Sequence, residues 1–125
     1  MSFSTTIDQG LLDTFLTENT TLYLGYSTST PTKAGTNITE PAGGTGYLRV
    51  DISTNLTRTD SEIDNDAEIE FPEATSSQGT ITHAVLFDAD TAGNMLWFGA
   101  LTSPKAIDSG DVPRIPIGDF NITQV

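Results

Sequence analysis

Six carboxylates at alternate positions form the pattern in this chain with the clearest capacity for chemistry. They are Asp60, Glu62, Asp64, Asp66, Glu68 and Glu70. Alternate side chains of an extended segment point to the same side, so all six would share one face, with neighbours about 7 Å apart. Repulsion between neighbouring charges would then be about 0.6 kcal/mol in water and about four times that at an effective dielectric near 20. Such a face must stay in water or be neutralised.

Three interpretations of these carboxylates remain open. They form a solvated outer face or flexible loop, a docking surface for Lys and Arg side chains of another subunit, or a calcium or magnesium site. The segment lacks the Gly at loop position six and the spaced bidentate Glu of an EF-hand, which disfavours the metal site. We expect neither a metal nor any other cofactor.

His83 is the only histidine, so any general-base chemistry must use it or a carboxylate. By alternation it shares a strand face with Ile81, Val85 and Phe87, and a histidine in such company is more often a core residue than a catalyst. No G-x-S-x-G nucleophile elbow and no glycine-rich phosphate loop accompanies it. The chain also has no cysteine, which excludes disulfides and thiolate catalysis. We expect a protein that is not an enzyme.

The charge balance limits the partners. Seventeen acidic residues against five basic ones give a formal net charge of -12, which repels nucleic-acid phosphates and anionic lipid surfaces. A basic protein or a cation is favoured instead, unless the surplus carboxylates only keep the protein soluble. No apolar run approaches the roughly 20 residues that span a bilayer, and the amino terminus lacks the features of a signal peptide. We expect a soluble protein made in the cytoplasm, with no nucleic-acid or membrane partner.

The elements that carry these residues are predominantly strands. A length of 125 residues suits one domain, 1–125, and abundant Thr with frequent Gly and Pro favours strands and turns over helices. Gly79 to Leu101 predicts two strands joined by a tight turn, with apolar residues on both faces, so this hairpin should lie inside a two-layer structure and not at its edge. Further strands are predicted at Leu22–Tyr26, Tyr47–Ile52, Ala67–Phe71, Val112–Ile117 and Phe120–Ile122. These seven or so strands indicate an all-β antiparallel β-sandwich or jelly roll.

Two other segments supply interface candidates. Residues 5–17 predict one short helix whose apolar stripe, including Ile7, Leu11 and Phe15, should dock on the sheet or on a neighbouring subunit. A loop of about twenty residues from Ser27 to Gly46 is long for a compact domain, and such loops commonly contact partners. In and beside this loop the candidate interface residues are Tyr26, Pro31, Glu40, Pro41 and Tyr47. In the strand that follows, we expect Leu48, Val50 and Ile52 to face inward and Tyr47, Arg49 and Asp51 outward.

Two blocks of the chain resemble a set of small bacteriophage virion proteins, described as tail-fibre or minor structural proteins. The first block comprises Leu22-Tyr23-Leu24, Ser27-Thr28, Pro31, Gly35, Thr39-Glu40-Pro41, Gly46-Tyr47 and Arg49. The second comprises Phe71-Pro72, Ala74-Thr75, Gly79 to His83, Phe87-Asp88-Ala89, Gly93-Asn94, Leu96 and Gly99-Ala100-Leu101. The resemblance covers most of the chain and implies a non-enzymatic component of a virion that assembles in the host cytoplasm.

A compact domain of this size lacks the repetitive shaft of a fibre and is similar to capsid decoration, or cement, proteins. We therefore expect it to bind major capsid protein subunits as a dimer or trimer, since many symmetry-related copies offset weak single contacts. The alternative is a tail-associated protein that binds a host surface carbohydrate, which predicts an exposed aromatic platform and a shallow groove. A third possibility, glycan hydrolysis, predicts a cleft around His83 or a close carboxylate pair.

Overall fold

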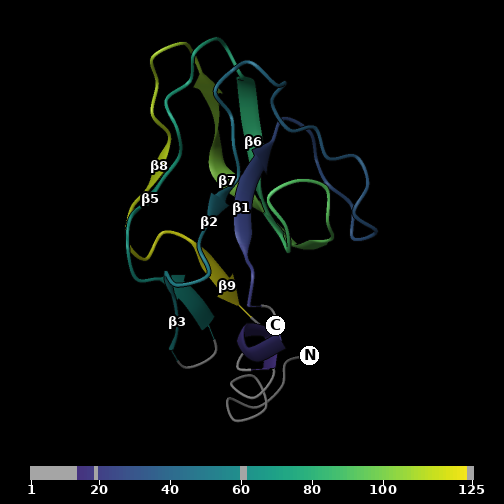
Figure 1. The fold of residues 1–125 in the computed structure, drawn as a ribbon, viewed down its shortest axis with the longest axis vertical. Helices are drawn as coiled ribbons and strands as arrows, with labels where there is room; N and C mark the ends of the chain where they lie inside the picture. The colour runs from purple at the N-terminus through teal and green to yellow at the C-terminus, as the bar shows by residue number, and fades with distance from the viewer. Residues whose placement is uncertain (1–13, 19, 60–61, 124–125) are drawn as a thin grey trace.

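The computed structural model describes residues 14–18, 20–59 and 62–123. These residues form nine strands, with a short helical segment at residues 14–18, and every strand pair among them is antiparallel (Figure 1). The predicted all-β class with a short amino-terminal helix is therefore confirmed. Ile7 and Leu11 of the predicted helix lie outside the described residues. None of the described helical residues belongs to a segment long and apolar enough to cross a membrane.

The largest sheet has four strands in the order β2-β1-β6-β7. They are β1 (Tyr23–Ser27), β2 (Val50–Asp51), β6 (Gly79–Phe87) and β7 (Met95–Ile107). The predicted central hairpin is present as β6 and β7, but only β6 lies inside the sheet. β7 forms an edge, and its apolar run Met95 to Phe98 is half-buried, not enclosed. The prediction of an interior hairpin was wrong for β7, because apolar residues on both faces of a strand do not require a neighbour on both sides.

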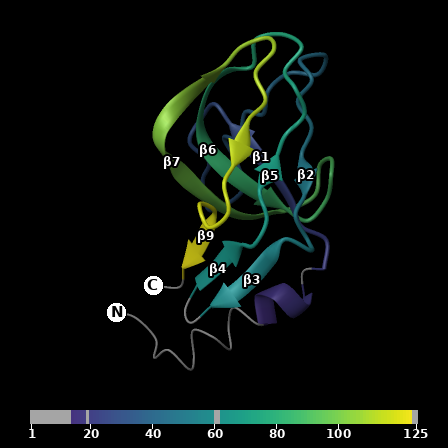
Figure 2. The same ribbon diagram turned by 90° about the vertical axis from the view of Figure 1, so that its left-hand side faces the viewer.

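A second layer consists of two smaller sheets. One contains β3 (Leu56–Thr59), β4 (Glu62–Asn65) and β9 (Asn121–Thr123), and the other pairs β5 (Ile69–Glu70) with β8 (Arg114–Ile115). Figure 2 shows β5 and β8 across from the large sheet and β3, β4 and β9 below them. Prolines flank β8 on both sides, which limits it to a short edge strand as its sequence predicts.

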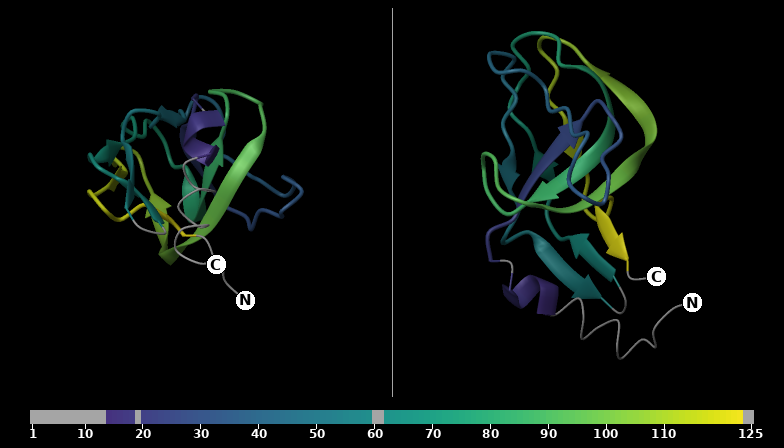
Figure 3. Two further views of the ribbon diagram at one scale, coloured as in Figure 1. Left: turned by 90° about the horizontal axis from the view of Figure 1, so that it is seen from below. Right: turned by 90° about the vertical axis from the view of Figure 1, so that its right-hand side faces the viewer.

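The core lies between these layers. Its fully buried side chains come from both layers and from the segments that join them: Leu22, Leu24, Ile52, Ile63, Ile69 and Leu86. Each such side chain stabilises the fold by about 1.5–3 kcal/mol relative to an exposed one. Phe15 and Leu16 of the helix pack against this core, as the amphipathic pattern predicts. The views from below and from the opposite side show the helix at the end of the molecule that also carries β3 and β4 (Figure 3).

The segment after the long loop differs from its predicted alternation. Only Val50–Asp51 forms a strand, and Leu48, predicted to face inward, is 65% exposed. Tyr47 and Arg49, predicted to face outward, turn toward the protein. Tyr47 accepts a hydrogen bond from the backbone N–H of Tyr26, and the Arg49 guanidinium lies 3.4 Å from the centre of the Phe87 ring. These polar and cation–π contacts outweigh the alternation of apolar residues.

β7 contains a large bulge. Ile81 pairs with Lys105 and His83 pairs with Ala100, so residues 101–104 of β7 lie opposite the single residue Thr82. Bulges bend a strand and increase its twist. Figure 2 shows the result, since β7 bows out to the left, away from β8. The bulge therefore opens a space between β7 and the segment that contains β8.

Candidate functional site

The acidic segment faces water as its alternation predicts. Asp66, Glu68 and Glu70 are exposed, whereas the intervening Ile63 and Ile69 are buried. Glu62 and Asp64 are half-exposed, and a hydrogen bond with Asp64, together with its charge, raises the pKa of Glu62. Asp60 lies outside the described residues.

Several acidic side chains already have partners within the chain. The hydroxyl of Thr57 donates to Asp66 over 2.5 Å, the side-chain amide of Asn121 donates to Asp64, and Arg114 lies 3.6 Å from Glu68 and 3.5 Å from Glu70. Within the described ranges, no group of three or more His, Asp or Glu side chains is placed to hold a metal ion. The docking of this face on a basic partner stays a prediction.

His83 is half-buried, and its Nδ1 lies 2.8 Å from the hydroxyl of the adjacent Thr82. Its ring centre lies 6.3 Å from that of Phe98. Among the described contacts no carboxylate orients this imidazole, and neither of the two cavities described below includes it in its lining. The geometry gives no support to glycan hydrolysis at His83.

Residues of the long loop form an internal network instead of an exposed patch. Tyr26 and Pro31 are buried, so they do not form an exposed loop patch for a protein partner, although Tyr26 lines a cavity described below. The hydroxyl of Tyr47 donates to Glu40, and Arg49 binds both oxygens of Glu40, with nitrogen–oxygen distances of 2.7 and 2.9 Å. Burial alone would raise the pKa of Glu40, but the hydrogen bonds from Arg49 and Tyr47 and the charge of Arg49 lower it.

This network fastens the loop to the large sheet. Arg49 also donates to the carbonyls of Ala89 and Ala92 in the β6–β7 turn, over 2.9 and 2.8 Å. Gly25 is required beneath it, because a Cβ there would lie 2.2 Å from the Tyr47 hydroxyl. Pro41 and Phe15 are half-buried, and their role at an interface stays a prediction.

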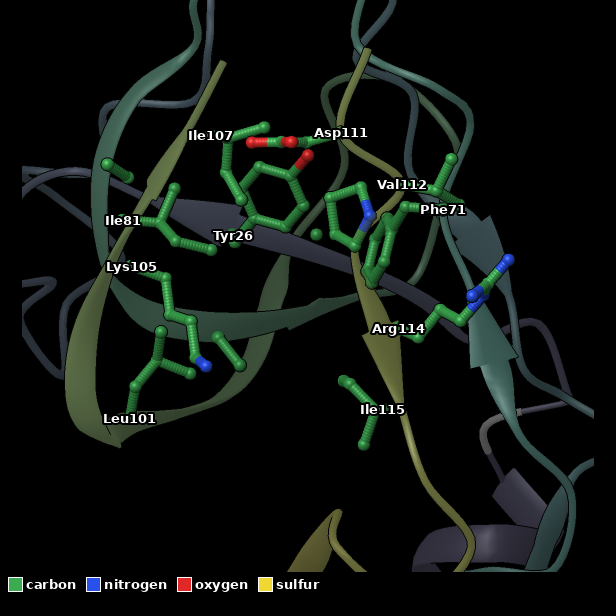
Figure 4. Close-up of a pocket in the computed structure, with 14 residues that line it drawn as sticks. Tyr26, Phe71, Ile81, Leu101, Lys105, Ile107, Asp111, Val112, Arg114 and Ile115 are labelled. Atoms are coloured by element: carbon green, nitrogen blue, oxygen red, sulfur yellow. The ribbon is translucent and has the colours of Figure 1, made fainter. Parts of the chain in front are cut away.

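The space beside the β7 bulge holds two adjoining cavities, which we call the β7 groove. The first, of about 380 Å³, lies between β7 and residues 111–115, and Figure 4 shows its lining. Its walls are mainly apolar: Tyr26, Phe71, Ile81, Leu101, Ile107 and Ile115. Burial raises the pKa of Tyr26 to about 12, so its phenol stays protonated and donates to Gln78 over 2.5 Å.

The second cavity is larger, about 690 Å³, and continues along β7 to residues 116–121. It shares Ala84, Leu101, Lys105, Arg114 and Ile115 with the first, so the two form one continuous groove. Volumes of this size are typical of ligand sites. Polar groups line its rim: Thr102, Ser103, Asp119 and Asn121.

An aromatic pair forms the far end of the groove. Trp97 is half-buried and meets Phe120 edge to face, with ring centres 5.1 Å apart. Its indole lies against Gly99, where a Cβ would come within 2.6 Å of the ring. The missing Cβ at this position therefore leaves room for the Trp97 ring, which lines the larger cavity.

Asn65 holds the opposite wall of the β7 groove in place. It is 1% exposed, and its amide donates to the carbonyls of Ala67 and Pro116, each over 2.9 Å. Its side-chain oxygen accepts the backbone N–H groups of Gly118 and Phe120, each over 3.0 Å. One side chain thus fixes the path of the chain between β8 and β9.

Sequence reasoning did not find this groove. The sequence places Trp97 in an apolar strand, and no pattern in it assigns a role to Lys105, Arg114 or Phe120. One usable signal was present, because the Ser103-Pro104-Lys105 run at the end of an apolar strand indicates an edge or a bulge. The opposite wall of the groove comes from residues 111–121, which lie next to β7 only in the folded chain.

Comparison with known proteins places the chain among phage proteins. No curated protein matches it. The family model described as "Podophage GP4 fiber I protein gp80" matches residues 2–123, which is nearly the whole chain. This agrees with the resemblance to bacteriophage virion proteins, but it favours a fibre over capsid decoration, for which it gives no support. The chain belongs to the podophage GP4 fiber I protein gp80 family, a family of virion fibre proteins.

Proposed function

We propose that this protein is a non-enzymatic fibre component that binds a carbohydrate on the surface of the bacterial host through the β7 groove. The observation that carries the proposal is the half-buried Trp97 at the end of a groove with a polar rim. Sugar rings present apolar C–H faces and a periphery of hydroxyls, so they suit a site that combines an aromatic ring with hydrogen-bonding side chains.

The rim offers both donors and acceptors for sugar hydroxyls. Thr102 and Ser103 carry hydroxyl groups on the bulge of β7, and both residues are exposed. On the facing wall, Asp119 supplies carboxylate oxygens. Strands form the floor of the groove, so the protein loses little conformational entropy when a ligand binds.

The proposal is tested by adsorption of the fluorescently labelled protein to host cells. We expect saturable binding that is lost when the surface glycans are oxidised with periodate. Trp97→Ala should weaken binding roughly tenfold or more, because truncation of an aromatic anchor commonly costs about 2 kcal/mol. Tyr23→Ala, an aromatic change on a half-buried side chain outside the groove, is the matched control and should leave binding unchanged. Equal binding by the Trp97 variant and the unaltered protein would refute the proposal.

We also propose that the chain acts as a homo-oligomer on the virion, as a dimer or trimer. Displaying several copies on one fibre would turn a weak single-site affinity into firm attachment without new contacts. Sedimentation of the purified protein measures this directly. A lone monomer at all concentrations would contradict it.

A further inference from the structure

Both basic side chains of the β7 groove lie where its two cavities join. Lys105 and Arg114 line both cavities, whereas Asp111 lines only the first and Asp119 only the second. Two basic residues therefore line the centre of the groove, while each outer part carries a carboxylate. This arrangement stands out because the whole chain has five basic residues against seventeen acidic ones.

Lys105 and Arg114 differ in their ion-pair partners within the chain. Arg114 rises from β8 with its guanidinium turned toward β5, where Glu68 and Glu70 lie 3.6 and 3.5 Å away (Figure 4). The side chain of Lys105 extends from β7 toward the cavity, and it has no ion pair with any described residue. An exposed ammonium without a counterion in a protein of net charge -12 is a ready partner for an anionic group of a ligand.

The following inference rests on the proposed carbohydrate binding. We propose that the β7 groove recognises an oligosaccharide with one carboxylate-bearing sugar between neutral sugars, and that Lys105 binds the carboxylate. The neutral sugars would lie toward Trp97 on one side and toward the apolar lining around Tyr26 and Ile81 on the other. A polymer with a carboxylate on every sugar is disfavoured, because its outer charges would approach Asp111 and Asp119.

A defined pair of ligands tests this inference. The probes are the trisaccharide GlcNAc–GlcA–GlcNAc, which has a single central carboxylate, and the methyl ester of the same trisaccharide, which has none. Binding is measured by calorimetry or by NMR titration of the full chain in 0.15 M salt. We expect the acid to bind about tenfold more tightly than the ester, which is the scale of one charge-assisted hydrogen bond.

Substitution assigns the effect to Lys105. Lys105→Gln should remove the preference for the acid, whereas Lys33→Gln, an exposed lysine in the long loop, should retain it. Arg114→Gln should have a smaller effect, since Arg114 already faces two glutamates. Lys105 is exposed, so both lysine variants should keep the unfolding temperature of the unaltered protein.

The outcomes separate this inference from the proposed function. Equal binding of acid and ester, or a preference that Lys105→Gln leaves intact, would overturn the inference while a loss with Trp97→Ala still supports carbohydrate binding. Failure of both probes to bind a protein that adsorbs to host glycans through Trp97 would likewise overturn only the inference. Failure of the probes together with Trp97-independent adsorption would overturn both.

Discussion

Single polar side chains inside this protein decide the position of whole segments. Asn65 is the clearest case, because four hydrogen bonds join its amide to the chain between β4 and β9. Nothing in the local sequence marks it, since it occupies a position in the acidic alternation where Ile or Ala would be expected. Its function depends on partners more than fifty residues away.

Asn65→Ala should lower the free energy of unfolding by about 2–4 kcal/mol, because it leaves buried N–H and C=O groups without partners. It should also weaken carbohydrate binding by releasing the wall that carries Asp119 and Phe120. Denaturant unfolding and the adsorption assay measure the two effects. Asn55→Ala, at a half-exposed asparagine in the turn before β3, is the matched control. Unchanged stability of the Asn65 variant would contradict this account of the wall.

Glu40 has a comparable role in the long loop. Glu40→Gln should cost about 2–3 kcal/mol, since it removes the charge that faces the buried Arg49. The folded-state pKa of Glu40 is lowered from 4.5, so the stability that its charge contributes is present above pH 4.5 and is lost as the pH falls through the folded-state value.

The stability difference between the unaltered protein and Glu40→Gln should thus be constant from pH 7 to about pH 5.5 and shrink at lower pH. Denaturant melts at several pH values measure this difference. Glu73→Gln, at an exposed glutamate, serves as the control for a general charge effect. A difference that grows on acidification would show that the sign of the pKa shift is wrong.

At the scale of elements, β7 builds the site through its bulge and through Gly99. Gly99→Ala would place a Cβ within 2.6 Å of the Trp97 ring, so the indole must move away from its position along the strand. Because Trp97 is the only tryptophan, intrinsic fluorescence reports on this end of the groove alone.

We expect Gly99→Ala to shift the emission of Trp97 and to weaken carbohydrate adsorption severalfold, with a loss of stability of about 1–3 kcal/mol from overpacking. Gly43→Ala, at a glycine outside the groove where a Cβ would have no neighbouring atom within 4 Å, is the matched control. An unaltered emission spectrum would show that the position of the Trp97 ring does not depend on Gly99.

The elements also show how far sequence reasoning reaches. The β6–β7 hairpin, the docking of Phe15 and Leu16 on the core and the outward face of the acidic segment follow from local periodicity, and the structure confirms them within the described residues. The edge position of β7 and the inward turn of Tyr47 and Arg49 cannot be predicted from local periodicity, because they depend on contacts between distant parts of the chain. The groove was missed for the same reason, since its walls come from β7 and from residues 111–121.

For the whole molecule, the net charge and the geometry of the groove suggest different kinds of partner. The net charge of -12 suggests a basic partner, but much of the acidic segment already contacts Arg114, Thr57 and Asn121. The β7 groove instead combines an aromatic end, a polar rim and a central cation. A fibre protein with such a groove is suited to recognise a surface ligand, and its negative charge would limit non-specific adsorption to anionic cell surfaces.

The most direct measurement is NMR mapping of the isotopically labelled protein titrated with soluble fragments of the host surface polysaccharide. We expect saturable shifts confined to both walls of the groove, at Trp97, Leu101, Lys105, Ile115 and Phe120. Saturable shifts confined to the long loop at residues 28–49 or to the acidic face, or no shifts at all with fragments that compete for adsorption, would contradict it.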